Sequence, residues 1–188
     1  MKKAYLIHGW GGNPENGWFP WLKRELEEQG YKVFAPAMPD TENPKINAWV
    51  GALKKIIEPD KNTILIGHSI GCQTILRYLG SLDSSDTKIR FGGVFLVAGF
   101  VHLKGLESKE EEEIAKPWLS TPINWEKVRS RAKKFVAFFS DNDVFVPVED
   151  SKIFKEKLNA KIILEHNKGH FDDEASIKEL SSLLKEIR

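Results

Sequence analysis

The fold is decided by one stretch of the chain, Thr63-Ile64-Leu65-Ile66-Gly67-His68-Ser69-Ile70-Gly71. Its first four residues form a short apolar, partly β-branched run, which is typical of a strand buried in a sheet. The next five match the pattern Gly-x-Ser-x-Gly, and a helical pattern comes next at Cys72–Leu79. In this strand-turn-helix setting a serine sits on a strained turn, close to the backbone N–H groups of a helix N-terminus. Ser69 is therefore predicted to be a nucleophile; the alternative is a glycine-bounded turn with an incidental serine.

The rest of the chain alternates short apolar runs with helical patterns. Further strands are predicted at Ala4–Ile7, Tyr31–Ala35, Gly93–Ala98, Phe135–Phe139 and Lys161–Leu164. Helices are predicted at Phe19–Gln29, Ile46–Glu58, Ser151–Leu158 and Ala175–Ile187. Strands buried on both faces and separated by helices favour a three-layer α/β/α sandwich with about six mostly parallel strands. No repeat or linker divides the sequence, so we expect one domain over residues 1–188. Its working residues should lie at the carboxyl ends of the strands.

The composition excludes several kinds of partner. With 28 basic and 27 acidic residues and a net charge of +1, the chain has no field of one sign to hold nucleic acid or an anionic membrane. The first apolar run stops at His8-Gly9, too early for a signal peptide or a membrane span. A single cysteine, Cys72, leaves no internal disulfide and suits a reducing compartment. We expect a cytoplasmic protein without nucleic acid, membrane or cofactor.

A glycine-rich loop, His8-Gly9-Trp10-Gly11-Gly12, comes after the first predicted strand. If Ser69 attacks a carbonyl, the resulting oxyanion needs two backbone donors, each worth roughly 3–4 kcal/mol of the barrier. One should be the N–H of Ile70, the residue after the nucleophile, and the other the N–H of Trp10. A phosphate-binding loop is the rival interpretation, but no Lys-Ser/Thr pair comes after the glycines and Gly-x-Gly-x-x-Gly is absent. His8 itself is predicted to be a packing residue.

A nucleophilic serine needs a histidine base, and His170 is the strongest candidate because it comes after the last predicted strand. His68 lies inside the turn and should point away from the Ser69 hydroxyl, whereas His102 could line a pocket. His166 and His170 have the spacing His-x-x-x-His, which on a helix could hold zinc. The intervening Gly169 favours a loop, so no metal site is predicted.

The carboxylate that orients the base should lie just after the preceding strand. Asp143 begins the sequence Asp-Val-Phe-Val-Pro in that loop, and Asp141 is a competitor that could cap the turn instead. With Asp143 as the partner, the catalytic residues occur in the chain order Ser69, Asp143, His170. This order is that of α/β-hydrolases and differs from the orders of other serine enzymes. Three motifs in this order, each after a strand, are more specific than any one of them.

Taken together, these segments resemble the small serine hydrolases related to retinoblastoma-binding protein 9. The resemblance covers nearly the whole chain and is carried by Trp21-Leu22, Arg24-Glu25-Leu26, Met38-Pro39-Asp40, Gly67-His68-Ser69, Arg77-Tyr78, Trp125-Glu126-Lys127, Asp143, Pro147 and Gly169-His170-Phe171. It implies a compact α/β-hydrolase fold without a cap domain and places the triad on the same three residues. The retinoblastoma-binding pattern Leu-x-Cys-x-Glu is absent, so that partner is not expected. The segment Phe100–Leu119 looks longer than usual, and its acidic run Glu110–Glu113 is predicted to be the solvated face of a helix.

The predicted pocket favours a small acyl ester or thioester as substrate. Its mouth should gather Met38, Phe100, Trp118 and Phe145 together with Trp10, although aromatic residues at loop ends are often plain packing. The same triad could serve an amidase or peptidase. A non-catalytic interaction protein on this scaffold is the alternative from another class. A dehalogenase would need an aspartate in place of Ser69, and a cofactor-free dioxygenase has no positive support.

Overall fold

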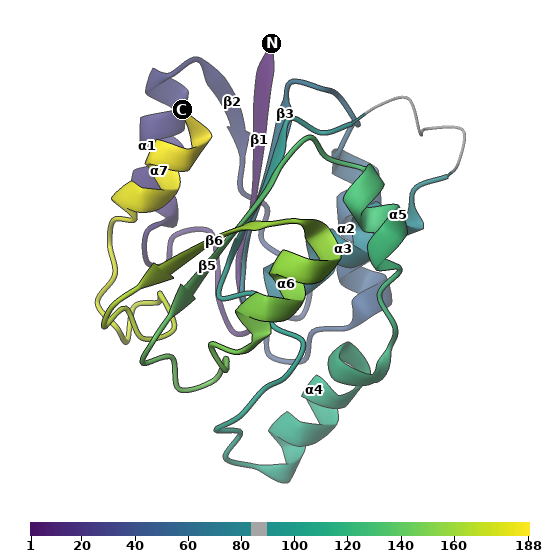
Figure 1. The fold of residues 1–188 in the computed structure, drawn as a ribbon, viewed down its shortest axis with the longest axis vertical. Coiled ribbons are helices and arrows are strands. Elements are labelled where there is room, and N and C mark those ends of the chain that lie inside the picture. The colour runs from purple at the N-terminus through teal and green to yellow at the C-terminus, as the bar shows by residue number, and fades with distance from the viewer. Residues whose placement is uncertain (84–89) are drawn as a thin grey trace.

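A parallel sheet of six strands forms the centre of the molecule, in the order β2-β1-β3-β4-β5-β6 (Figure 1). The computed structural model describes residues 1–83 and 90–188. The strands are β1 (Lys2–Ile7), β2 (Tyr31–Phe34), β3 (Thr63–His68), β4 (Gly93–Val97), β5 (Phe135–Ser140) and β6 (Lys161–Glu165). Every neighbouring pair runs parallel. The predicted strands are all present, and their ends differ from the prediction by at most two residues.

Helices cover both faces of the sheet. They are α1 (Phe19–Glu28), α2 (Ile46–Ile56), α3 (Ile70–Ser81), α4 (Lys109–Ser120), α5 (Trp125–Ser130), α6 (Asp150–Leu158) and α7 (Ser181–Ile187). Figure 1 shows α1 and α7 on one side of the sheet and α2, α3, α5 and α6 on the other. This confirms the predicted three-layer α/β/α sandwich. None of the helices in the described part of the chain has the length and hydropathy needed to cross a bilayer.

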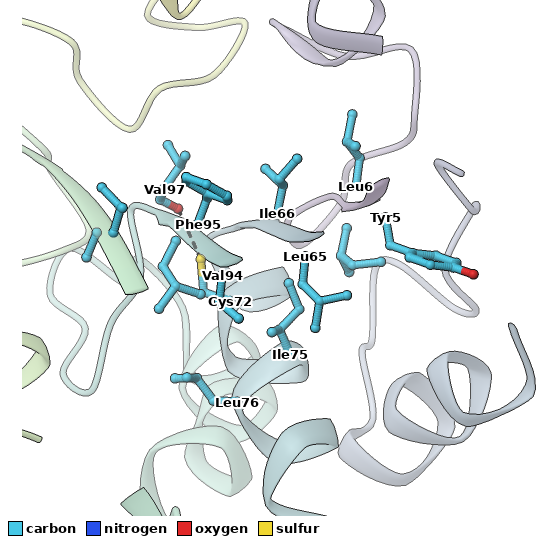
Figure 2. Packing of buried hydrophobic residues seen from close by; sticks show 14 of the residues in the cluster. Tyr5, Leu6, Leu65, Ile66, Cys72, Ile75, Leu76, Val94, Phe95 and Val97 are labelled. Carbon is cyan, nitrogen blue, oxygen red and sulfur yellow. Dashed lines mark hydrogen bonds between the residues drawn. The ribbon is translucent and has the colours of Figure 1, made fainter. Parts of the chain in front are cut away.

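In the core, α3 packs against the two central strands (Figure 2). Leu65 and Ile66 of β3 and Phe95 of β4 are fully buried, as are Ile75 and Leu76 of α3. Burial of each such side chain is worth about 1.5–3 kcal/mol relative to exposure. Because β3 is buried along its whole length, it can carry apolar residues at every position rather than at alternate ones. The strand that leads to the predicted nucleophile therefore lies in the buried core of the molecule.

The strand order places a crevice at the carboxyl ends of β1 and β3. The chain passes from β1 to its neighbour β2 and then returns across β1 to form β3 on the other side. In open parallel sheets the loops diverge at such a reversal, and ligands bind there. The glycine-rich loop comes directly after β1 and Ser69 directly after β3, so both border this crevice.

The C-terminal helix is shorter than predicted. The expected helix over Ala175–Ile187 begins only at Ser181, and the preceding residues form turns. The Asp172 side chain accepts a hydrogen bond from the Ala175 N–H, and Ser176 has a positive φ of 57°. A short polar side chain that binds nearby backbone competes with the helix. The segment therefore remains a loop at the carboxyl edge of the sheet.

Candidate active site

Ser69 lies between β3 and α3 on a strained backbone. Its φ of 52° and ψ of −120° lie outside the regions that residues with side chains ordinarily adopt. The residue is 8% exposed, and within the described residues its hydroxyl has no hydrogen-bond partner. A Cβ on Gly67 would lie 2.8 Å from Cys72 N, and one on Gly71 would lie 2.2 Å from Ile7 O. Both glycines of the motif are thus required by close approaches of backbone around this turn.

Two backbone N–H groups border the same space. The Ile70 N–H stands in the first turn of α3, where helical N–H groups lack intrahelical partners. Neither it nor the Trp10 N–H has an acceptor among the described residues. The glycine-rich loop is fixed by a bond from Gly11 N to Thr41 O and by one from Trp10 Nε1 to Glu42 O, both 2.9 Å. Two unpaired N–H groups, one in the first turn of α3 and one in a fixed loop, are suited to binding an anionic oxygen.

His170 and Asp143 form a close pair beside this turn. His170 Nδ1 lies 2.9 Å from Asp143 Oδ2 and 3.1 Å from Oδ1. Asp143 is 4% exposed, and its Oδ1 also accepts bonds from the N–H groups of Phe145 and Val146. Burial raises the pKa of Asp143, but the hydrogen bond and charge of His170 and the two N–H groups outweigh it, so the pKa lies below its usual value. Asp143 is therefore ionised at neutral pH.

The competing aspartate, Asp141, makes different contacts. Its Oδ2 lies 2.6 Å from His166 Nδ1, and its Oδ1 accepts a bond from the Asn167 N–H. Both partners are exposed, as is Asp141 itself. His166 and His170 thus lie in one loop, each beside its own aspartate. Among the described residues no group of three or more His, Cys, Asp or Glu side chains is arranged to hold a metal ion.

His68 has a structural role that the sequence did not indicate. Its Nε2 donates a hydrogen bond of 2.7 Å to the backbone carbonyl of His170. Burial, together with the charge of His170, lowers the pKa of His68 to about 4, so the ring is neutral at pH 7. His68 therefore ties the loop of His170 to the end of β3. The only sequence signal was its position next to Ser69.

The other two histidines lie away from the base position. His8 is 2% exposed, and its Nε2 accepts a bond from the Met38 N–H, in keeping with a packing role. Burial lowers the pKa of His8. His102 is largely exposed, and its Nδ1 lies 2.6 Å from Asp150 Oδ1. It does not line the cavity that contains Ser69.

A cavity of about 570 Å³ opens onto the turn. Its lining includes six of the residues predicted for the site, namely Ser69, His170, Ile70, Trp10, Phe100 and Phe145. The buried Asp143 lies behind His170 and is not part of the lining. Met38 and Trp118, which were predicted to line the pocket, do not. Met38 is 4% exposed, and Trp118 is 1% exposed with its Nε1 bonded to Pro44 O. Both side chains belong to the core, Met38 from the loop after β2 and Trp118 from α4.

Comparison with known proteins identifies the family of this chain. Residues 4–187 match the model of a family described as serine hydrolase. YdeN of Bacillus subtilis is 31% identical over 172 residues, which cover 90% of this chain and 86% of that protein. Serine hydrolase RBBP9 of Rattus norvegicus is 28% identical over 174 residues, 91% of this chain and 88% of that one.

Solved structures extend the agreement to the fold. The crystal structure of the YdeN gene product superposes with a TM-score of 0.86 at 27% identity, covering all of this chain and 97% of that one. Est1E from Butyrivibrio proteoclasticus, solved with ferulic acid bound, has a TM-score of 0.70 at 16% identity, over all of this chain and 90% of its own. The α/β-hydrolase fold expected from the sequence is confirmed. Since the family match spans nearly the whole chain, the protein belongs to the serine hydrolase family and is a hydrolase.

Proposed function

We propose that this hydrolase cleaves small acyl esters or thioesters, with Ser69 as nucleophile, His170 as general base and Asp143 as the group that orients the base. The observation that carries the proposal is that the strained Ser69, which has no hydrogen-bond partner among the described residues, and His170 border one cavity. His170 Nδ1 lies 2.9 Å from the buried carboxylate of Asp143. A cavity of about 570 Å³ falls in the range of small-molecule sites.

In the first half of the reaction, Ser69 Oγ attacks the substrate carbonyl carbon while His170 Nε2 accepts the hydroxyl proton. The bond between His170 Nδ1 and Asp143 selects the tautomer that leaves Nε2 free to accept. Asp143 then stabilises the imidazolium that forms. The oxyanion lies against the N–H groups of Ile70 and Trp10, which are already fixed before substrate arrives.

The first half ends when the alcohol or thiol leaves with the proton from His170 and the acyl group stays on Ser69 as an ester. The second half is hydrolysis of this ester. Water then attacks this ester while His170 Nε2 takes a proton from it. Collapse of the second tetrahedral intermediate returns the proton to Ser69 Oγ and releases a carboxylic acid. The chemistry needs no group beyond the chain and water.

The strain at Ser69 supports catalysis over a purely binding role. A non-glycine residue with φ near +50° costs of order 1–3 kcal/mol and persists where the surroundings impose it. A binding module would gain nothing from holding a serine in this conformation over a cavity. Because the triad could also cleave amides, the decisive test detects the activated serine itself rather than turnover of a single substrate.

The first experiment is labelling of the purified protein with a fluorophosphonate probe, which reacts with activated serines. We expect labelling of the wild type and none of Ser69→Ala. His170→Ala and Asp143→Asn should reduce the labelling rate by roughly two to four orders of magnitude, because the base is lost or held in the wrong tautomer. Asp141→Asn is the matched control, since Asp141 contacts His166 instead, and it should label at close to the wild-type rate.

Two outcomes would contradict the proposal. Folded wild-type protein that does not react with the probe would exclude an activated serine and favour a binding role. Equal labelling rates in Asp143→Asn and Asp141→Asn would remove Asp143 from the mechanism. Circular dichroism of each variant establishes that it is folded before the rates are compared.

A further inference from the structure

The cavity around Ser69 has a strongly biased charge. Its lining contains five carboxylates, Glu42, Glu111, Asp172, Asp173 and Glu174. In the part of the chain that the structure describes, no lysine or arginine lines it. The whole chain is nearly neutral, with 28 basic and 27 acidic residues. The negative charge at the site is therefore a local arrangement rather than a consequence of composition.

Two of the five carboxylates are partly engaged in holding the loops. Asp173 forms an ion pair with Lys178 and accepts a bond from the Asn16 side chain. Asp172 accepts a bond from the Ala175 N–H through Oδ1. These contacts fix the loop that comes after His170, and Lys178 offsets part of its charge.

The other three carboxylates keep their charge uncompensated. Within the described residues, none of Glu42, Glu111 and Glu174 forms an ion pair. Glu111 accepts bonds only from the backbone N–H groups of Glu107 and Ser108, as part of the capping box of α4. Glu42 and Glu174 are exposed. Three unpaired anions thus border the opening from three different segments.

Glu42 and Glu174 come from two different segments of the chain, and both line the cavity that contains Ser69. The Glu42 carboxylate lies 3.7 Å from the position that a Cβ on Gly11 would occupy, over the glycine-rich loop, and its backbone carbonyl holds Trp10 Nε1. Glu174 stands four residues after His170 in the loop after β6. Ser69 lines the same cavity; it is 8% exposed, and its hydroxyl has no partner among the described residues.

We propose that this site selects esters that carry a positive charge, such as a quaternary ammonium group, over neutral and anionic esters of the same shape. The proposal rests on the proposed hydrolytic function and adds the charge of the substrate. Unpaired carboxylates attract a cation and repel an anion over distances up to about the Debye length, roughly 10 Å at 0.1 M salt. The aromatic rings of Trp10 and Phe145 line the same cavity and add a further attraction for cations.

Three thioacetates of similar size provide the test, read by thiol release. Acetylthiocholine is cationic, 3,3-dimethylbutyl thioacetate is its neutral counterpart, and the thioacetate of 3-mercaptopropionic acid is anionic. We expect kcat/KM to fall in that order, with a cation-to-neutral ratio of at least roughly threefold, as two to three unpaired charges several ångströms away would produce in water. Raising the salt concentration from about 0.02 to about 0.3 M should lower the ratio because exposed charges are screened.

Charge-neutralising variants test whether the carboxylates that line the cavity cause the preference for a cationic substrate. Glu42→Gln with Glu174→Gln should lower the cation-to-neutral ratio toward one, by roughly 1.5-fold to twofold for each carboxylate removed. The matched control is Glu110→Gln with Glu113→Gln, which removes two exposed carboxylates of α4 that do not line the cavity, and it should leave the ratio as in the wild type. Using a ratio cancels any general effect of the variants on the enzyme.

The failures of the two proposals are distinguishable. If the neutral thioester is hydrolysed but the ratio is close to one, or is unchanged by Glu42→Gln with Glu174→Gln, charge selection is wrong and the hydrolytic mechanism stands. If no thioester is turned over and the fluorophosphonate probe does not label Ser69, the proposed function fails and charge selection fails with it.

Discussion

The side chain of His68 shows how one residue of the motif can serve stability rather than chemistry. It is 8% exposed, and its Nε2–H is donated to the carbonyl of His170 at 2.7 Å. Protonation would place a positive charge in a dry site next to the ring of His170, whose centroid is 5.0 Å away. Burial is the larger cause of the low pKa of about 4, and the charge of His170 is the second. The neutral ring is therefore part of the folded structure.

This low pKa predicts a loss of stability in mild acid. Above pH 6.5 the folded and unfolded chains both carry a neutral His68. Below pH 6.5 the unfolded chain binds a proton that the folded chain does not, so the free energy of unfolding falls until the pH reaches the folded pKa near 4. The difference between the unfolded pKa of 6.5 and the folded pKa of about 4 corresponds to a loss of about 3 kcal/mol in the free energy of unfolding.

Urea denaturation from pH 7 to pH 4 measures this effect. His68→Gln keeps an amide donor but does not titrate, so the stability advantage of the wild type over this variant should shrink as the pH falls. Other titrating groups are shared by the two proteins and cancel in the difference. A constant difference between wild type and His68→Gln across this range would contradict the prediction.

At the residue scale, the motifs predicted the three residues of the proposed triad, whose roles stay a prediction, whereas the positions decided by packing were missed. Ser69, Asp143 and His170 lie where strands end, and chain order alone brings such residues to one edge of a parallel sheet. Met38 lies in the loop after β2 and Trp118 in α4, and the side chains of both belong to the core. Whether an apolar side chain at a loop end faces a pocket or the interior depends on the path of the loop, which no local pattern specifies.

At the element scale, the join between β1 and α3 depends on a single missing methyl group. A Cβ on Gly71 would lie 2.2 Å from Ile7 O and 2.7 Å from His8 O, and both atoms are backbone that cannot move aside as a side chain can. Gly51, in α2, has nothing within 4 Å of its added Cβ. The two glycines are both helical, and only one of them is required by contact.

We therefore expect opposite effects from the same substitution. Gly71→Ala should destabilise the protein by about 3 kcal/mol or more, because α3 must move away from the end of β1. Gly51→Ala should stabilise it by about 0.5–1 kcal/mol, since alanine loses less backbone entropy in a helix. Urea denaturation followed by circular dichroism gives both values. A Gly71→Ala protein as stable as the wild type would show that this contact does not constrain the fold.

The C-terminal loop marks the limit of prediction for elements. Residues 172–187 contain no glycine or proline, and their apolar spacing is helical. The structure nevertheless begins α7 at Ser181. Asp173 bonds to Asn16 and Gly17, more than 150 residues away in sequence, and this contact holds the segment against the first loop. Local periodicity carries no information about such a distant partner, which is why the helix was predicted too long.

At the scale of the whole molecule, the central strands and α3 form one core. β3, β4 and β5 are buried along their whole lengths, and α3, which packs mainly on β3, has ten consecutive buried residues, Ile70 to Leu79. The strand pattern predicted a parallel sheet, because only buried strands are apolar at every position. It did not predict the order β2-β1-β3-β4-β5-β6. That order is set by pairing between distant segments, and it is the reason that the glycine-rich loop lies beside Ser69.

The reactivity of the Cys72 thiol measures whether this core unfolds as a unit. Its Sγ is fully buried between α3 and β4 and donates to Val97 O at 3.3 Å (Figure 2). Burial raises the pKa of this thiol, and the thiolate is the reactive form. Because no local opening of a loop would uncover a residue between the central strands and α3, reaction should require unfolding of the whole core.

We expect Ellman's reagent to label native Cys72 at least about a thousandfold more slowly than it labels the urea-unfolded chain. The labelling rate should rise with urea in proportion to the equilibrium fraction unfolded. Lys157→Cys adds a second thiol on the exposed side of α6, where the lysine side chain is 45% exposed, and it should give one fast phase beside the slow one. Fast labelling of both thiols in the native protein, or a slow phase insensitive to urea, would mean that α3 separates from the sheet without global unfolding.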